Sequence, residues 1–279
     1  MNERISVYVS TRDRSMELYG LLVSLLNQSY KNFDVIIGDG SAPNSILGHH
    51  SIQSVCQRLK LEGHGVFGFS VQLQGVCHSR QECIEKDPWK TNELCLRIDD
   101  DTIIPPNYIE KLLEGIHAGY DLVSGLTPHC ASPEVMRETR FVKPIMNKIE
   151  IDAEGNIVKI GDDQALTYDT EEIIPTHHFR SSALYKRKIH DVFNYKLGLT
   201  PVGFREELWM SIRAILAGYK LAVHTGAKYW HLITSSGGCR FPNYAQMVQT
   251  DEAHMRSCCL LYTSPSPRDG ATSRMPSSA

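Results

Sequence analysis

Two different spacings of apolar residues alternate along the first hundred residues. Residues 5–10 (ISVYVS) alternate apolar with polar positions, which predicts a strand, and residues 34–37 form a second short apolar run. Between them leucines recur three and four positions apart, as on one face of a helix, at Leu18, Leu21, Leu22, Leu25 and Leu26. The pattern further predicts a strand within 66–73, a helix over 76–86 and a strand from Leu94 to Asp99. Strands alternating with helices predict an α/β fold with a mostly parallel sheet and helices on both faces.

The later part of the chain carries fewer such signals. Residues 219–223 predict a strand, and residues 148–160 predict a β-hairpin in which apolar residues alternate on both sides of the turn AEGN. We expect this hairpin to belong to an insertion over about residues 134–175 of a single domain that spans 1–258.

Residues 259–279 differ from the rest in composition. The last twenty residues hold five serines and three prolines without a hydrophobic period, which is typical of a disordered tail. The segment also resembles a translated adapter or cloning scar. We therefore expect the tail to be non-native and the native sequence to have continued differently beyond Cys258.

Composition limits the functional classes. The chain has 279 residues, of which 42% are hydrophobic and 22% are charged, so it is an ordinary globular protein. Its net charge of −3 argues against a general nucleic-acid binder. No apolar segment approaches the roughly 20 residues of a membrane span, and no signal peptide is visible, so we expect a cytoplasmic protein without a transmembrane segment. Its eight cysteines form no CxxC pair, which is typical of reduced thiols.

The strongest chemical signal is Asp99-Asp100-Asp101 at the end of an apolar run. Adjacent carboxylates repel one another, so three of them after a buried strand predict a bound cation. Side chains at i and i+2 of extended backbone point the same way, which lets Asp99 and Asp101 share one ion while Asp100 faces elsewhere. Carboxylate oxygens favour Mg²⁺ or Mn²⁺. The alternative is a solvated turn in which one Asp caps a helix near residues 105–107.

Polar residues also follow the first two predicted strands. Thr11 and Asp39 stand at strand ends of the same kind as Asp99. Ligands of parallel α/β sheets bind at the carboxyl ends of the strands, so one cleft is expected to hold all three positions.

Several segments together resemble family 2 glycosyltransferases of the GT-A fold. The first two, VSTRD at 9–13 and LLNQSYKNFDVIIGDGS at 25–41, are similar to the family's opening, and the Asp triplet stands where the family has its DxD motif. Residues 75–80 (GVCHSR) resemble the segment before that motif, and 203–213 (GFREELWMSIR) with 217–221 (AGYKL) resemble the helix that bears the catalytic base. The resemblance covers roughly residues 5–231 and implies a Rossmann-like GT-A domain.

The resemblance implies a donor-binding set of six residues: Thr11, Arg12, Asp39, Arg80, Asp99 and Asp100. Thr11 and Asp39 would face a uracil-like base. Arg12 and Arg80 would lie near the base or the diphosphate, since guanidinium groups offer paired donors to anionic oxygens. Asp99 would also face the ribose or donor sugar. The alternatives are that Asp39 is a turn residue and that the arginines are ordinary surface residues.

The metal set implied by the resemblance is Asp99, Asp101 and His231. A neutral imidazole would complete the carboxylate ligands, and His224 is the competing histidine.

The family's usual Glu-Asp pair is Glu206-Glu207 in this chain. The expected base is therefore Glu207, with Glu206 beside it. A second departure is Gly38, which replaces the first of two acidic residues common after the second strand. The alternative is that both glutamates only stabilise a helix N-terminus through its dipole.

The implied function is transfer of a hexosyl or N-acetylhexosaminyl group from a nucleoside-diphosphate sugar, with uridine favoured. The acceptor hydroxyl is of unknown origin (saccharide, lipid-linked or protein), Mn²⁺ or Mg²⁺ is the expected cofactor, and inversion is the expected stereochemistry. A sugar nucleotidyltransferase is a rival, but it should have a Gly-rich loop where this chain has Thr11-Arg12-Asp13-Arg14-Ser15. A non-catalytic sugar-nucleotide-binding homologue is the second rival.

Overall fold

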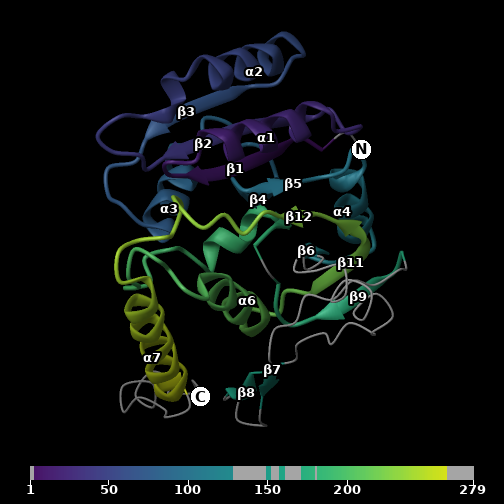
Figure 1. Cartoon of the computed structure of the whole chain (residues 1–279). Coiled ribbons are helices and arrows are strands. Elements are labelled where there is room, and N and C mark those ends of the chain that lie inside the picture. Colours follow the sequence, from purple (N-terminus) through teal and green to yellow (C-terminus); the bar gives the residue numbers. More distant parts are fainter. Residues whose placement is uncertain (1–2, 128–148, 152–156, 161–170, 180, 263–279) are drawn as a thin grey trace, which may run out of the picture.

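The central feature of the structure, a computed structural model, is one eight-stranded sheet (Figure 1). The structure describes residues 3–127, 149–151, 157–160, 171–179 and 181–262. The strand order is β3-β2-β1-β4-β10-β6-β11-β9. Parallel pairing joins β3 to β2, β2 to β1, β1 to β4 and β6 to β11, whereas β10 and β9 are antiparallel to their neighbours. The strand bounds are β1 Ile5–Thr11, β2 Phe33–Asp39, β3 Val66–Ser70, β4 Leu94–Asp99, β6 Leu122–Leu126, β9 Ile173–Thr176, β10 Ala183–Lys186 and β11 Leu221–Lys228.

Helices cover both faces of this sheet, and each face has its own hydrophobic core. Helices α1 (Ser15–Leu26), α2 (His50–Leu61) and α4 (Tyr108–His117) pack in one core, while α3 (Val76–Lys86) and α6 (Glu206–Leu216) pack in the other. Side chains of a strand alternate between faces, so Val7 and Val9 enter the first core and Tyr8 enters the second. Met255 of α7 (Tyr244–Tyr262) also belongs to the second core. Burial of these two cores against the sheet is the main favourable contribution to the fold.

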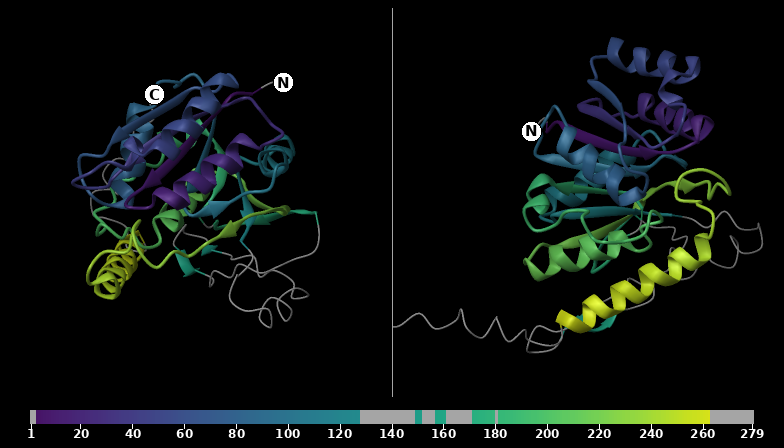
Figure 2. Two further views of the ribbon diagram at one scale, coloured as in Figure 1. Left: turned by 45° about the horizontal axis from the view of Figure 1, so that its top comes forward. Right: turned by 90° about the vertical axis from the view of Figure 1, so that its left-hand side faces the viewer.

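Smaller elements complete the chain. A two-stranded ribbon joins β5 (Thr102–Ile103) to β12 (Trp230–His231), and β7 (Ile149–Ile151) pairs with β8 (Ile157–Ile160). Two 3₁₀ turns, η1 (Ile46–Gly48) and η2 (Arg187–Asp191), lie in connections. The stretch between β12 and α7 crosses toward α3 before the chain enters the long α7 helix, seen in yellow in Figures 1 and 2.

The predicted fold class is confirmed: a mostly parallel sheet, helices on both faces and the antiparallel hairpin formed by β7 and β8. The remainder of the predicted insertion at 134–175 lies mostly outside the described residues. No helix in the described part of the chain is long and apolar enough to cross a membrane. Among the described side chains, Cys56, Cys77, Cys83, Cys95 and Cys239 form no disulfide bond, and the reduced state stays a prediction.

Three element bounds differ from the predictions. Strand β11 begins at Leu221 and continues to Lys228, because its pairing with β6 resumes at Lys228 after an irregularity that follows His224. Strand β3 ends at Ser70, where its pairing with Asp39 of β2 ends. Helix α7 runs to Tyr262, past the expected start of the tail at 259, because the Ser/Pro-rich composition that opposes a helix begins only after it. Residues 263–279 lie outside the described part.

A half-buried histidine in η2, His190, gives the fold a predicted acid sensitivity. Burial, and then the charge of Arg187, lower the pKa of His190 to about 4, while its Nε2 lies 3.0 Å from the Tyr185 hydroxyl. Below pH 6.5 the unfolded chain therefore binds a proton that the folded chain does not, so stability falls as the pH drops toward 4. Between pH 7 and pH 5 we expect the wild type to lose about 2 kcal/mol more unfolding free energy than His190→Gln in urea titrations. Parallel pH profiles of the two proteins would contradict this assignment.

Candidate functional site

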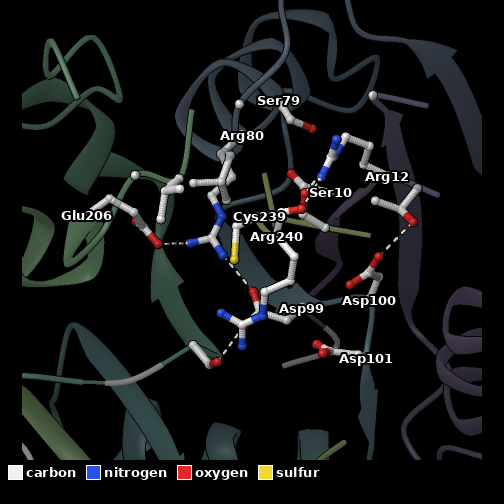
Figure 3. A pocket seen from close by; sticks show the side chains of 18 of the residues that line it. Ser10, Arg12, Ser79, Arg80, Asp99, Asp100, Asp101, Glu206, Cys239 and Arg240 are labelled. Carbon is white, nitrogen blue, oxygen red and sulfur yellow. Dashed lines mark hydrogen bonds and ion pairs between the residues drawn. The ribbon is translucent and has the colours of Figure 1, made fainter. Parts of the chain in front are cut away.

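A cavity opens at the carboxyl ends of β1 and β4 (Figure 3). In the parallel register of these strands Ser10 lies beside Asp99, so the residues after each strand meet at one edge of the sheet. The start of α6 and the segment 238–241 close other sides of the cavity. Of the predicted site residues, all except Asp39 line it: Thr11, Arg12, Arg80, Asp99, Asp100, Asp101, Glu206, Glu207 and His231.

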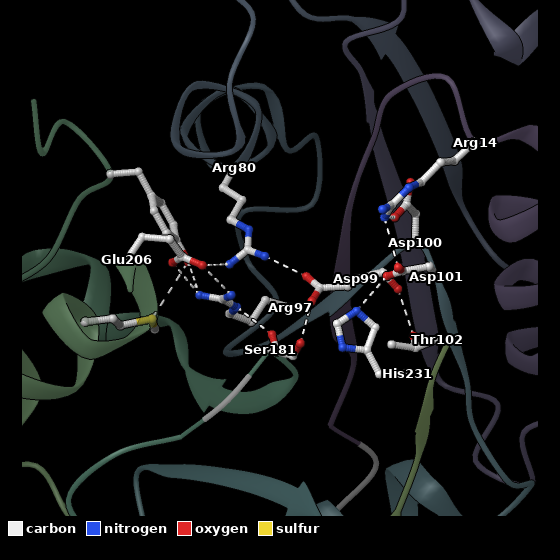
Figure 4. A network of polar contacts seen from close by, with 12 residues as sticks. Arg14, Arg80, Arg97, Asp99, Asp100, Asp101, Thr102, Ser181, Glu206 and His231 are labelled. Atoms are coloured by element: carbon white, nitrogen blue, oxygen red, sulfur yellow. Dashed lines mark hydrogen bonds and ion pairs between the residues drawn. The ribbon is translucent and has the colours of Figure 1, made fainter. Parts of the chain in front are cut away.

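Asp99, Asp101 and His231 form a group whose ligand atoms lie within 4.8 Å of one another (Figure 4). Asp99 ends β4, Asp101 stands in the turn before β5, and His231 pairs with Thr102 across the β5–β12 ribbon. His231 Nε2 lies 2.9 Å from Asp101 Oδ1. We call these three residues the acid–histidine group. Asp101 and His231, which are 130 positions apart in the sequence, are brought together by the ribbon and by the bond from Leu232 N to the carbonyl of Asp101.

The acid–histidine group fits a divalent cation. Asp101 Oδ1 is fully buried and has no well-directed hydrogen bond within the described part of the chain, despite the nearby imidazole. A buried carboxylate oxygen in that state is suited to a metal bond. Two carboxylates and one imidazole are also ligand types that Mg²⁺ or Mn²⁺ accepts. The competing His224 is not part of the cavity lining, because its Nε2 pairs with Glu114 Oε2 at 2.8 Å.

Burial lowers the pKa of His231, but the Asp101 and Asp99 carboxylates outweigh burial and raise it. The same negative charge that holds a proton on this imidazole would attract a cation to the site. In the structure the two carboxylates are also in contact with Arg14 and Arg80, at 3.0 Å and 2.6 Å.

Asp100 is not part of this group, although Arg14 Nη1 lies 3.0 Å from both Asp100 Oδ1 and Asp101 Oδ2. Its carboxylate accepts hydrogen bonds from Thr11 Oγ1 at 2.7 Å and from Arg14 Nη1 at 3.0 Å. Burial raises the pKa of Asp100 to about 7, with Arg14 opposing the shift and Asp101 adding to it. Asp100 thus ties β1 to the turn that follows β4.

A chain of charged contacts runs from Asp99 to the start of α6 (Figure 4). Arg80 donates from Nη2 to Asp99 Oδ1 at 2.6 Å and from Nη1 to Glu206 Oε1. Arg97 donates to both oxygens of Glu206 at 2.7 Å. The remaining oxygen of Asp99 accepts from the Ser181 hydroxyl at 2.5 Å. The two ends of the cavity are thus joined through Arg80.

Glu206 and Glu207 differ in their surroundings. Glu206 is 3% exposed, and burial raises its pKa while the Arg97 guanidinium opposes that shift. Two guanidinium groups occupy its oxygens, which leaves little capacity to accept a substrate proton. Glu207 is half-buried and lines the same cavity one residue further along α6. The sequence predicted that Glu206 and Glu207 stand at a helix start, and α6 does begin at Glu206. The structure adds that the two acids differ in burial.

Arg12 and Arg14 hold the segment 234–241 beside the cavity. Arg12 Nε donates to the carbonyl of Gly238 at 2.6 Å, and its guanidinium carbon lies 3.8 Å from the centre of the Phe241 ring. Arg14 Nε donates to the carbonyl of Ser236 at 2.9 Å. In this state Arg12 lines the cavity but is engaged with the protein's own chain.

Asp39 is the predicted residue that the structure does not bring into the cavity lining. Its carboxylate accepts from Ser41 N at 2.9 Å, Ser45 Oγ at 2.6 Å and Ile46 N at 2.9 Å. These bonds close the turn before η1, as the turn-residue alternative predicted. Contact of Asp39 with a nucleobase stays a prediction.

Four residues with a part in this arrangement were missed in the sequence: Arg14, Arg97, Ser181 and Asp251. Arg97 had a signal, since an arginine inside an apolar strand that is covered on both faces must have an anionic partner. Asp251 of α7 accepts from Thr200 N at 2.7 Å and Phe204 N at 2.8 Å, and so fixes the loop before α6. No local pattern marks Asp251, because its partners lie far away in the sequence.

Solved structures similar to this chain include those of TarS from S. aureus. A structure of TarS residues 1–349 aligns with a TM-score of 0.54 and 15% identity, covering 81% of this chain and 60% of that one. The same part of TarS in complex with UDP-GlcNAc aligns with a TM-score of 0.56 and 12% identity, covering 90% and 66%. Another TarS structure gives 0.54 and 13%, covering 98% and 46%. This chain therefore spans between about half and two thirds of the length of these structures, and at such identities the likeness shows the fold.

No curated protein sequence matches the chain. The family model described as glycosyl transferase family 2 matches residues 6–191, which is well over half of the chain and includes β1, the Asp triplet and β10. The α/β sheet and the cavity at its carboxyl edge agree with that match. The chain belongs to glycosyl transferase family 2.

Proposed function

We propose that this protein transfers a sugar from a UDP-sugar donor to an acceptor hydroxyl, with a divalent cation and with inversion at the anomeric carbon. The observation that supports this most directly is the cavity itself. It holds a cation-type ligand group at one end and a glutamate at the other, joined by Arg80. A binding module would need the first feature, whereas sugar transfer also needs an acid that can take a proton, a part that we assign to Glu207 and not to the Arg80-bound Glu206.

Uridine is the proposed nucleoside of the donor, with uracil as its base. The TarS structures similar in fold include complexes with UDP-GlcNAc and with UDP. In the present chain Thr11, Arg12 and Gly40 line the cavity beside β1. We place the nucleoside there and the diphosphate toward Asp101 and His231.

Asp99, Asp101 and His231 would hold the cation, and the charge of a bound cation would stabilise the leaving diphosphate. Glu207 would take the proton of the acceptor hydroxyl while that oxygen forms its bond to the anomeric carbon. The bond from the anomeric carbon to the diphosphate oxygen breaks at the same time, and the electron pair leaves with the diphosphate. Attack from the face opposite the leaving group inverts the configuration.

Glu206 has a supporting part in this proposal. Held by Arg97 and Arg80, it fixes the first turn of α6 and so sets the position of Glu207. Asp251 supports the same helix start through Phe204 N. We propose that residues 1–258 form one transferase domain, in which α7 stabilises the loop before the catalytic helix.

A panel of sugar nucleotides tests the proposed function. We expect release of UDP from at least one of UDP-glucose, UDP-galactose, UDP-GlcNAc, UDP-GalNAc and UDP-glucuronate in the presence of Mn²⁺, and release at least about tenfold slower with EDTA. GDP- and CDP-sugars serve as controls for the base. Tight binding of UDP-sugars without any release or transfer would support the non-catalytic homologue. Preferred release from GDP- or CDP-sugars would contradict the uridine assignment.

A further inference from the structure

The charges that line the cavity do not balance pair by pair. Six arginines and five carboxylates line it. Arg14, Arg80 and Arg97 each pair with buried carboxylates at 3.0 Å or less, and Arg12 lies 3.8 Å from Asp13. Arg205 and Arg240 have no carboxylate partner within the described part of the chain. Both side chains are half-buried, and a guanidinium that is partly withdrawn from water without a counter-charge favours an anionic ligand.

Arg240 belongs to the end of the cavity near Asp101. Its Nε faces the carbonyl of Thr234 at 3.5 Å, and Thr234 N faces Asp101 Oδ2 at 3.3 Å. That is the end at which the diphosphate is proposed to bind. The diphosphate of the donor would therefore supply the counter-charge of Arg240. No such partner is yet proposed for Arg205.

Arg205 stands at the opposite end, directly before Glu206 and Glu207. Its Nε is fully buried without a hydrogen-bond partner among the described residues, and its guanidinium carbon lies 5.3 Å from the Phe204 ring centre. A cation at this place is next to the proposed base, where the acceptor and the donor sugar would meet.

The backbone of Arg205 adds an independent observation. Its φ of 63° and ψ of 25° lie in the left-handed region, which glycine or asparagine adopts at lower cost than arginine. Gly203, two residues earlier, has a φ of 61°. Arginine persists at a position that disfavours it, and strained residues of this kind cluster at functional sites.

We infer that Arg205 is a specificity-determining residue that binds a carboxylate or phosphate group of the substrate beside Glu207. The inference rests on the proposed function and deepens it. The anion can belong to the donor sugar, as in a uronic acid, or to the acceptor. Both sources present the same chemistry to the guanidinium, namely paired acceptor oxygens.

Calorimetry with matched ligand pairs tests the inference in two arms. The donor arm compares UDP-glucuronate with UDP-glucose in the presence of Mn²⁺. The acceptor arm compares glycerol 3-phosphate with glycerol on protein saturated with UDP and Mn²⁺. In one of the arms we expect the anionic ligand to bind about tenfold or more tightly than its neutral counterpart.

Arg205→Gln is expected to reduce that preference to about twofold or less, while Arg205→Lys keeps part of it. Arg58→Gln is the matched control, because Arg58 is 63% exposed on α2 and lies outside the cavity lining. All four proteins should bind UDP with the same affinity, since Arg205 is placed away from the diphosphate.

The outcomes distinguish the role of Arg205 from the proposed transferase function. A preference in the donor arm that Arg205→Gln abolishes supports an anionic sugar, and one in the acceptor arm supports an anionic acceptor. Equal binding of charged and neutral ligands in both arms, or a preference that survives in Arg205→Gln, overturns the inference while the UDP control still upholds the proposed function. Absence of UDP binding to the wild type would instead refute the proposed function, and the inference with it.

Discussion

Replacing Glu207 by Gln is expected to cut the turnover of sugar transfer by about a hundredfold or more while the affinity for the sugar nucleotide changes less than about twofold. A general base acts on the acceptor in the transition state and touches the bound donor little. Glu207 is the half-buried acid of the pair in the cavity wall. Steady-state kinetics of UDP release, together with calorimetric UDP-sugar binding, measure the two effects separately.

Glu206→Gln is the informative comparison for that variant. Glu206 is buried between Arg97 and Arg80, so loss of its charge leaves guanidinium groups without a full counter-charge. We expect a milder effect on turnover but a loss of unfolding free energy of about 3 kcal/mol in urea titrations. If the two variants exchange these behaviours, Glu206 is the base. If neither slows transfer, the pair only stabilises the start of α6, and the base must be another residue of the cavity.

Replacing Asp101 by Asn is expected to abolish the effect of Mn²⁺ on UDP binding. The buried Oδ1 of Asp101 is the oxygen in the acid–histidine group that lacks a well-directed hydrogen bond. Outer partners of metal ligands alone contribute about 10- to 100-fold to metal affinity, so loss of a ligand should cost at least about a hundredfold. Isothermal calorimetry with Mn²⁺ and with EDTA measures the effect, and the variant should give the same UDP affinity under both conditions.

Asp13→Asn is the matched control for this experiment. Asp13 is also close to an arginine of the cavity, at 3.8 Å from Arg12, but its side chain is 50% exposed. This variant should keep the full difference between the UDP affinity measured with Mn²⁺ and that measured with EDTA. An Asp101→Asn protein that keeps this difference would exclude the acid–histidine group as the cation site.

Arg80 connects the two ends of the cavity that these experiments test, because its guanidinium contacts an acidic residue at each end. Its guanidinium binds Asp99 at one end and Glu206 at the other. A cation that draws on Asp99 would weaken the hold of Asp99 on Arg80, and the guanidinium would then have Glu206 as its remaining partner. The donor end and the α6 end are thus in direct electrostatic contact, which the positions of these residues in the sequence do not reveal.

The sequence by itself determined the alternation of strands and helices and the place of the carboxylates at a strand end. Apolar spacing sufficed for this, because burying one face of a helix imposes a period and burying both faces of a parallel strand imposes a continuous apolar run, and both are visible within a dozen residues. It also predicted that Asp99 and Asp101 would share one ion without Asp100, but Asp100 and Asp101 lie in a turn, so the grouping with His231 depends on the tertiary structure. Local sequence pattern also predicted the helix over 76–86 with the bounds that the structure has.

Tertiary structure alone decided which charges meet. Arg97 contacts Glu206 over 109 positions, His231 reaches Asp101 over 130, and Asp251 reaches Phe204 through a helix that packs from the far end of the chain. Asp39 has the sequence position of a ligand contact, yet the turn that follows it occupies its oxygens. Ion pairs and hydrogen bonds act over a few ångströms in space, whatever the separation along the chain. Local patterns therefore fix the elements, and the packing of those elements fixes the chemistry of the cavity.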